Sequence, residues 1–265
     1  MNTFARTRSP LPRALLAAAL AGVCANAFAG SGLERAKERG QLVAGIGYVV
    51  PEYKGGMKFR TAEALDTALL EDVARRLQLP LATVRAEPGK ADVALVTIAT
   101  SDPLRRSGTV IDTGYSAGPM AIMRSDTDIN AWEHLKGRKV CVSEGGPHVG
   151  TLAARYGAIE QVHKAPADSL VALRIGACDA AVHDSAMLEQ LIKLPEWKKF
   201  SARLPVGPRT TLAFVVPAGD QRSAAVLKQV ATAWAADGYL DRLMSKAVRQ
   251  IAFEVYLDQD VPDCH

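Results

Sequence analysis

Beyond its amino terminus, the sequence has no apolar run long enough to span a bilayer, no internal repeat and no low-complexity linker. It also has little excess charge, because the formal net charge of +4 falls to about +1 when the three arginines of the first 29 residues are removed. No basic face therefore remains for binding nucleic acid. The rest of the chain is long enough for one large domain or two small lobes, and we expect it to be soluble.

Residues 1–29 are typical of a secretory signal peptide. Three arginines precede a short apolar stretch at 14–23, and Ala27-Phe28-Ala29 forms a small-x-small cleavage site. Cys24 raises the alternative of a lipoprotein, but Val23 stands where a small residue normally precedes a lipidated cysteine. We therefore expect cleavage after Ala29 and a periplasmic protein.

Cysteine is scarce, and only Cys141, Cys178 and Cys264 lie beyond the signal peptide. Export permits disulfides. Cys141 lies in a predicted strand that begins a βαβ series, and Cys178 begins the third strand of that series. In the common strand order 2-1-3 these strands are neighbours, so we predict a Cys141–Cys178 disulfide. Cys264 would then be unpaired, and three free thiols are the alternative.

Residues 165–185 predict a helix that ends at Gly176, followed by a short strand at 179–182 that leads to Asp184. Ligands of open α/β sheets bind off the carboxyl ends of strands, so Asp184 is a candidate ligand contact. A solvated turn or the cap of the next helix is the alternative.

Aromatic residues follow the first predicted strand at 42–46. Tyr48 lies at its carboxyl end and Tyr53 in the loop beyond it, where aromatic rings often form the wall of a ligand cleft. Tyr115 precedes an apolar strand at 120–123 that could serve as a hinge. Each tyrosine could instead pack against its own loop.

Two stretches predict anion binding. Arg105 follows the apolar strand 92–97 in a polar turn, where a guanidinium can hold a carboxylate, although a solvated arginine is the alternative. The turn Gly145-Gly146-Pro147-His148 opens a predicted helix at 148–156, so its backbone N–H groups could bind an anion. The turn lacks the lysine of a nucleotide-binding loop, which favours a small ligand over ATP.

One connection is unusually short, because only residues 87–91 separate two predicted strands at 81–86 and 92–97. A crossover between parallel strands normally requires a dozen or more residues, usually a helix. Either the first segment is not a regular parallel strand, or a helix that would cover the sheet has been lost.

The order of these motifs resembles the extracellular solute-binding proteins of family 3, the polar amino-acid receptors of ABC importers. The resemblance covers nearly all of the chain after the signal peptide and depends on RGQLVAG at 39–45, DVARRL at 72–77, DVALVTIAT at 92–100, YSAG at 115–118, LKGRKV at 135–140, ALRIGACD at 172–179 with Asp184-Ser185, and AADGY at 235–239.

The resemblance implies an α/β, periplasmic-binding-protein-like two-lobed fold of type II, with two Rossmann-like lobes joined by two hinge strands. Lobe 1 would comprise residues 30–117 and 217–265, and lobe 2 residues 118–216. Closure of the lobes would couple ligand binding to motion.

The resemblance also implies ligand contacts. An α-carboxylate would be held by Arg105 and Thr100 and by amides of the turn Gly146–His148, an α-ammonium by Asp184, and the rest of the ligand would pack on Tyr53. Three features depart from the family pattern: the missing helix near residues 87–91, Asp102 in place of a hydroxyl residue, and Pro147-His148 in the lobe 2 turn.

We therefore expect a monomeric periplasmic receptor, with no catalysis and no cofactor, that passes a small carboxylated or zwitterionic ligand to a membrane permease. An accessory protein of the same fold that serves a periplasmic redox enzyme is the first alternative. A dehydratase-like enzyme is the second, and its candidate bases are Glu52, Glu144, His148 and His183. No set of nucleophile, base and third group is recognisable, and no histidine or cysteine spacing matches a zinc site.

Overall fold

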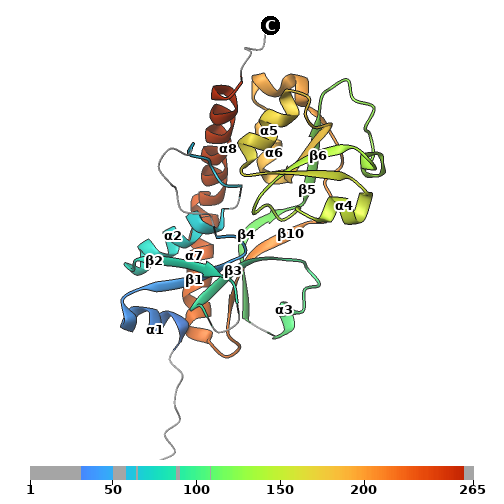
Figure 1. Ribbon diagram of the computed structural model, residues 1–265. Coiled ribbons are helices and arrows are strands. Elements are labelled where there is room, and N and C mark those ends of the chain that lie inside the picture. Colours follow the sequence, from blue (N-terminus) through green and yellow to red (C-terminus); the bar gives the residue numbers. More distant parts are fainter. Residues whose placement is uncertain (1–30, 50–57, 64, 88–89, 108, 260–265) are drawn as a thin grey trace, which may run out of the picture.

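The computed structural model describes residues 31–49, 58–63, 65–87, 90–107 and 109–259. It contains two five-stranded mixed sheets, one in each lobe (Figure 1). The first sheet has the order β2-β1-β3-β10-β4, formed by Leu81–Arg85, Leu42–Ile46, Val93–Ile98, Thr210–Val216 and Thr109–Ala117. The second has the order β7-β6-β8-β5-β9, formed by Ile159–His163, Lys139–Ser143, Ala180–Asp184, Pro119–Met123 and Ala202–Arg203.

The described helices are α1 (Gly32–Arg39), α2 (Asp66–Leu77), α3 (Leu104–Ser107), α4 (Thr151–Tyr156), α5 (Pro166–Arg174), α6 (Ser185–Leu191), α7 (Gln221–Asp237) and α8 (Tyr239–Leu257), with 3₁₀ turns at Trp132–Leu135 and Pro195–Phe200. Helix α1 begins with a capping box between Ser31 and Glu34, and it ends at Gly40 in the left-handed conformation. Helix α7 begins at the side-chain cap of Asp220.

Strand β2 settles the question of the short connection. It pairs in parallel with β1, and β1 pairs in parallel with β3 on its other side, so β2 is a regular strand. The residues of the connection that the structure describes, 86–87 and 90–92, form no helix. The chain instead crosses close to β1, because a Cβ atom at Gly45 would lie 3.1 Å from Ala86 and 3.4 Å from Ala91. Gly45 thus makes room for this short crossover.

Two chain crossings join the sheets. Strand β4 passes directly into β5 at Gly118, whose carbonyl accepts a hydrogen bond from the backbone of Ser185 (2.9 Å). The return crossing lies between β9 and β10. Strand β10 was predicted to end lobe 2, but it pairs with β3 and β4 and belongs to the first sheet. Lobe 2 therefore ends before Thr210.

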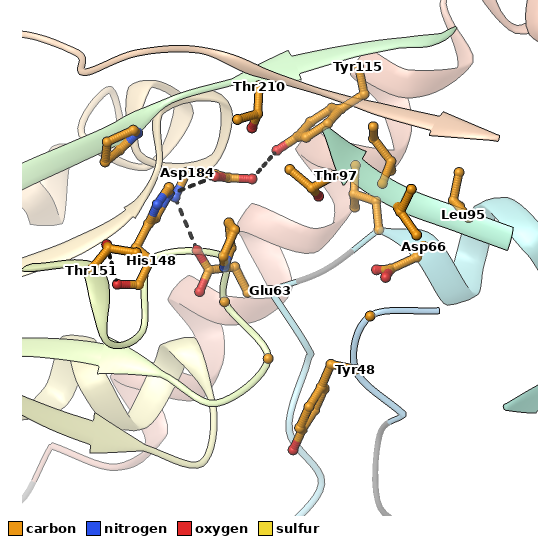
Figure 2. A pocket seen from close by; sticks show the side chains of 18 of the residues that line it. Tyr48, Glu63, Asp66, Leu95, Thr97, Tyr115, His148, Thr151, Asp184 and Thr210 are labelled. Carbon is orange, nitrogen blue, oxygen red and sulfur yellow. Dashed lines mark hydrogen bonds and ion pairs between the residues drawn. The ribbon is translucent and has the colours of Figure 1, made fainter. Parts of the chain in front are cut away.

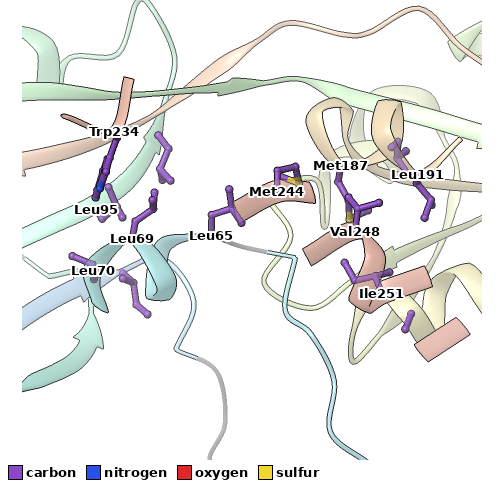
Figure 3. Close-up of a cluster of buried hydrophobic side chains, with 14 of the residues drawn as sticks. Leu65, Leu69, Leu70, Leu95, Met187, Leu191, Trp234, Met244, Val248 and Ile251 are labelled. Carbon is purple, nitrogen blue, oxygen red and sulfur yellow. The ribbon is translucent and has the colours of Figure 1, made fainter. Parts of the chain in front are cut away.

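Helix α8 connects the two lobes, which the sequence did not predict. The sequence pattern after the break at Gly238-Tyr239 predicts a helix over residues 241–248 only, but α8 continues to Leu257 and packs against α5 and α6 of lobe 2. Its buried face carries Met244, Val248 and Ile251. Figure 3 shows these side chains between the cluster around Leu69 and Trp234 and the side chains Met187 and Leu191.

One hydrophobic cluster consequently extends across both lobes. Burial of each large apolar side chain contributes about 2 kcal/mol. Separation of the lobes along α8 would therefore cost several kcal/mol, which limits how far they can swing apart.

The predicted disulfide is confirmed, since Cys141 and Cys178 are bonded, with their Cα atoms 5.9 Å apart. As predicted, β6 and β8 are parallel neighbours, and Cys141 pairs with Ala181. The predicted signal peptide, Glu52, Tyr53 and Cys264 lie outside the described residues. Over the described ranges, no helix combines the length and apolarity that a membrane crossing requires.

Candidate functional site

A cavity of about 650 Å³ lies between the two lobes, close to the crossing at Gly118. Lobe 1 contributes the end of β1, the start of α2, and strands β3, β4 and β10. Lobe 2 contributes the Gly145–His148 turn, α4 and the end of β8 (Figure 2). Its polar lining side chains are Tyr48, Glu63, Asp66, Thr97, Tyr115, His148, Thr151, Arg155, Asp184 and Thr210.

Asp184 lies in this cavity, as the sequence predicted, but both of its carboxylate oxygens already have partners. Tyr115 donates its hydroxyl hydrogen to Oδ2 (2.9 Å), and His148 Nε2 lies 2.9 Å from Oδ1. Burial, together with the charge of Asp184, raises the pKa of Tyr115, so the phenol remains a donor. We call Tyr115, His148 and Asp184 the Asp184 cluster.

Glu63 is the second acid of the cavity, and the sequence analysis missed it. It lies in the segment before α2, yet its carboxylate binds lobe 2: Oε1 accepts a hydrogen bond from the Asp184 amide (3.1 Å), and Oε2 accepts from Ser143 and lies 2.8 Å from His183 Nδ1. His183 in turn lies 2.8 Å from the Ser169 hydroxyl. All of these side chains are inside the protein, and the Glu63 side chain is only 3% exposed.

The charge state of Glu63 follows from these contacts. Burial alone would raise its pKa, but the opposing charge of His183 and hydrogen bonds from His183 and Ser143 lower the pKa to about 2. Glu63 is thus held as a carboxylate by lobe 2 groups, and it ties the lobes together at the cavity.

Asp66, the third acid, has a different environment. It is the first residue of α2 and is only 8% exposed. Within the described part of the chain, its carboxylate has no side-chain hydrogen bond or ion pair. Burial and the nearby charge of Asp184 raise its pKa to about 6, although a hydrogen bond from its own backbone amide opposes the rise. Figure 2 shows Asp66 on the side of the cavity toward Leu95, away from the Asp184 cluster.

Tyr48 closes one side of the cavity, where lobe 1 touches the lobe 2 turn. Its hydroxyl donates to Glu144 Oε2 (3.2 Å), and a Cβ atom at Gly145 would lie 2.3 Å from its ring. Gly145 also has a positive φ of 76°, so a glycine suits both the turn and the close approach. At Gly146, a Cβ atom would lie 2.9 Å from Glu63 Oε2.

Arg105 and Thr100 are not among the residues that line this cavity. Arg105 binds the Asp112 carboxylate of β4 (3.1 Å) and the Ala99 carbonyl (3.1 Å). Asp102 does not pair with Arg106 but accepts a hydrogen bond from the Leu104 amide (2.9 Å). The structure therefore brings Tyr48, Tyr115, Gly146, His148 and Asp184 together, and it leaves Arg105 and Thr100, the side chains of the proposed carboxylate clamp, outside.

The candidate catalytic histidines are both held by acids. His148 contacts Asp184, and His183 lies between Glu63 and Ser169. Among the described residues, the one group with metal-ligating atoms close together is Cys141, His163 and Cys178, and its two sulfur atoms are bonded to each other.

The sequence offered a weak signal for the two missed acids. Glu63 and Asp66 are three residues apart at the start of an amphipathic helix, a spacing that usually indicates helix-end acids. Only the three-dimensional structure shows that this helix end faces lobe 2.

No protein-family model matches the sequence, and no curated protein matches it. Solved structures do resemble it. Holo ArgBP from T. maritima is 21% identical, with a TM-score of 0.53, over 80% of this chain and 98% of that chain. The amino acid ABC transporter substrate-binding protein AbpA from Streptococcus pneumoniae, bound to L-arginine, is 16% identical, with a TM-score of 0.57, over 82% and 98%.

A third similar structure is an ancestral amino acid-binding protein, described as a precursor of cyclohexadienyl dehydratase. It is 20% identical, with a TM-score of 0.57, over 82% of this chain and 100% of that chain. These likenesses span nearly the whole length of each relative and concern the arrangement of helices and strands. The chain therefore has the two-lobed α/β fold of amino-acid-binding proteins of ABC transporters.

Proposed function

We propose that the protein is a periplasmic solute-binding protein that holds a small organic molecule between its lobes and presents it to the permease of an ABC importer. The cavity between the lobes is the observation that carries this proposal. Its volume of about 650 Å³ falls in the range of small-molecule sites, and it combines apolar walls with a few converging polar groups.

The site also has the rigidity that recognition requires. The Asp184 cluster and the Glu63 contacts fix the orientations of the cavity side chains before any ligand arrives, which reduces the entropy lost on binding. Because α8 and Glu63 join the lobes, we expect ligand entry to involve a small opening near Tyr48 and Gly145.

Isothermal titration calorimetry tests the proposal directly. The protein is stripped of bound ligand by unfolding and refolding with its disulfide intact, and it is then titrated with panels of amino acids, organic acids and amines. Saturable one-to-one binding in at least one panel is expected. A folded sample that binds no member of any panel would contradict the proposal.

Strand β2 favours a second candidate function. Every residue of this edge strand is partly exposed, and the described residues between it and β3 form no helix. An accessory protein could use such a half-covered edge to bind a periplasmic enzyme. Co-purification with a redox enzyme that is abolished by Thr83→Pro at this edge, with solute binding intact, would favour the accessory role.

A further inference from the structure

We infer that the cavity binds an organic cation, an amine or guanidine without an α-carboxylate, and that Asp66 is its direct partner. This inference rests on the proposed function and narrows it. It also departs from the carboxylated or zwitterionic ligand that the family resemblance implies. Four observations lead to it.

The first observation concerns the cations of the cavity. Arg105, the expected partner of a ligand carboxylate, is bound to Asp112 outside it. Within the described lining, Arg155 is the sole arginine or lysine, and it lies exposed with its guanidinium 5.4 Å from the ring centre of Tyr156. The described lining therefore offers a ligand carboxylate no buried arginine or lysine to neutralise it.

The second observation is that a carboxylate of the protein, that of Glu63, occupies donors that a ligand carboxylate could otherwise use. Glu63 accepts the hydrogen bonds of Ser143 and of the Asp184 amide at the carboxyl ends of β6 and β8. These donors are thus already used. In the adjacent turn, the amides of Gly146 and Val149 bond to carbonyls of the same turn, and Pro147 has no N–H.

The third observation is the unsatisfied acid. Asp66 is more than nine-tenths buried, lines the cavity, and has no side-chain partner in the described part of the structure. Its carboxylate has a hydrogen bond from its own backbone amide but none from a side chain of the described residues. Burial of a carboxylate with so little compensation is costly, and an ammonium or guanidinium group would satisfy it with charge-assisted hydrogen bonds.

The fourth observation is the aromatic lining. The rings of Tyr48 and Tyr115 line the same cavity as Asp66. Aromatic faces attract cations, most strongly where water is excluded. The buried acid has no cationic partner among the described residues, and two aromatic rings line the same cavity. Together these features form a site suited to a positively charged group.

Matched pairs of ligands test the inference, since agmatine differs from arginine, and putrescine from ornithine, by the α-carboxylate alone. In calorimetric titrations at pH 7.5, we expect agmatine and putrescine to bind at least tenfold more tightly than their carboxylated partners. Tighter binding of arginine, ornithine or glutamate would overturn the inference and leave the receptor function standing. Binding of none of these and of no other panel member would overturn both.

A substitution of Asp66 tests whether this residue is the partner of the ligand cation. Asp66→Asn should weaken agmatine binding at least tenfold and should melt no lower than the unaltered protein, because it removes a buried charge. Asp237→Asn, an exposed aspartate at the end of α7, is the matched control and should change neither quantity. Unchanged agmatine affinity in Asp66→Asn would overturn the assignment of Asp66.

Discussion

Glu63 and Asp66 are three residues apart, line the same cavity and are both buried, yet the protein treats their charges in opposite ways. Lobe 2 surrounds Glu63 with donors, and its pKa falls to about 2. Asp66 lies on the lobe 1 side without such donors, and its pKa rises to about 6. The comparison teaches that the protein itself supplies the hydrogen-bond donors for the carboxylate of Glu63, while the carboxylate of Asp66 remains available to a ligand.

The two acids also affect stability with opposite signs. The pKa of Glu63 is below its ordinary 4.5, so its contribution is present above pH 4.5 and is lost as the pH falls toward 2. The pKa of Asp66 is above its ordinary 3.8, so its ionisation destabilises the folded state as the pH rises from 4 through 6. A residue that lowers stability at neutral pH is typical of a binding site.

The largest effect is expected for Glu63→Gln. Removing one partner of a buried charged network should lower the free energy of unfolding by about 3 to 5 kcal/mol, because His183 and Ser143 lose their acceptor. Urea denaturation at pH 7 measures the change. Glu196→Gln at an exposed site is the control and should remain within about 0.5 kcal/mol. A loss below 1 kcal/mol for Glu63→Gln would remove the contrast between the two acids.

Asp66→Asn should change the free energy of unfolding in the opposite direction and raise it. The rise of its pKa from 3.8 to about 6 corresponds to a penalty of about 3 kcal/mol at pH 7.5 in the absence of ligand. The variant should therefore be more stable than the unaltered protein by about 2 to 3 kcal/mol at pH 7.5 and nearly equal to it at pH 4. Urea titrations at both pH values measure this difference. Destabilisation at pH 7.5 would show that Asp66 has a structural partner.

The affinity for agmatine should rise about tenfold between pH 5 and pH 7, as Asp66 passes from mostly protonated to mostly ionised. The charged and titratable groups that face it from the other elements of the cavity are Tyr48, Glu63, Tyr115, His148, Arg155 and Asp184. Calorimetry across this range measures the change. Asp66→Asn should lose the dependence, and a dependence that persists in the variant would assign it to His148 or another of these groups.

The smallest effect is expected for Arg105→Ala. Since Arg105 binds Asp112 and does not line the cavity, agmatine affinity should change by less than twofold, and stability by about 1 kcal/mol or less. Arg106→Ala is the matched neighbour. A tenfold loss of affinity for arginine, which carries the α-carboxylate, in Arg105→Ala alone would show that this side chain reaches the ligand and would restore the carboxylate clamp.

The sequence predicted the strands and the disulfide because these depend on local patterns. The apolar runs at 42–46, 93–98 and 139–143 fix the parallel strands, and the βαβ order makes the Cys141 and Cys178 strands neighbours. Helix α8 was predicted too short, although Met244, Val248, Ile251 and Val255 continue the helical spacing and no glycine or proline interrupts residues 249–257.

The site was harder to predict because it depends on contacts between distant segments. Arg105 was expected in the cavity, but its partner Asp112 comes from β4, which follows the turn and holds the guanidinium there. The contacts of Glu63 with Ser143 and His183 span 80 and 120 residues, and no sequence motif marks them. The position of Asp184 in the cavity could be predicted because the end of a strand is a local feature, and its contact with a ligand stays a prediction.

Proton release on ligand binding tests the central claim most directly. At pH 6, near the pKa of Asp66, agmatine is titrated calorimetrically in two buffers that differ in ionisation enthalpy. If the cation binds the ionised Asp66, about half a proton should be released for each ligand bound, and the Asp66→Asn variant should release none. Binding without proton release, or with proton uptake, would contradict the assignment of Asp66 as the direct partner of the ligand cation.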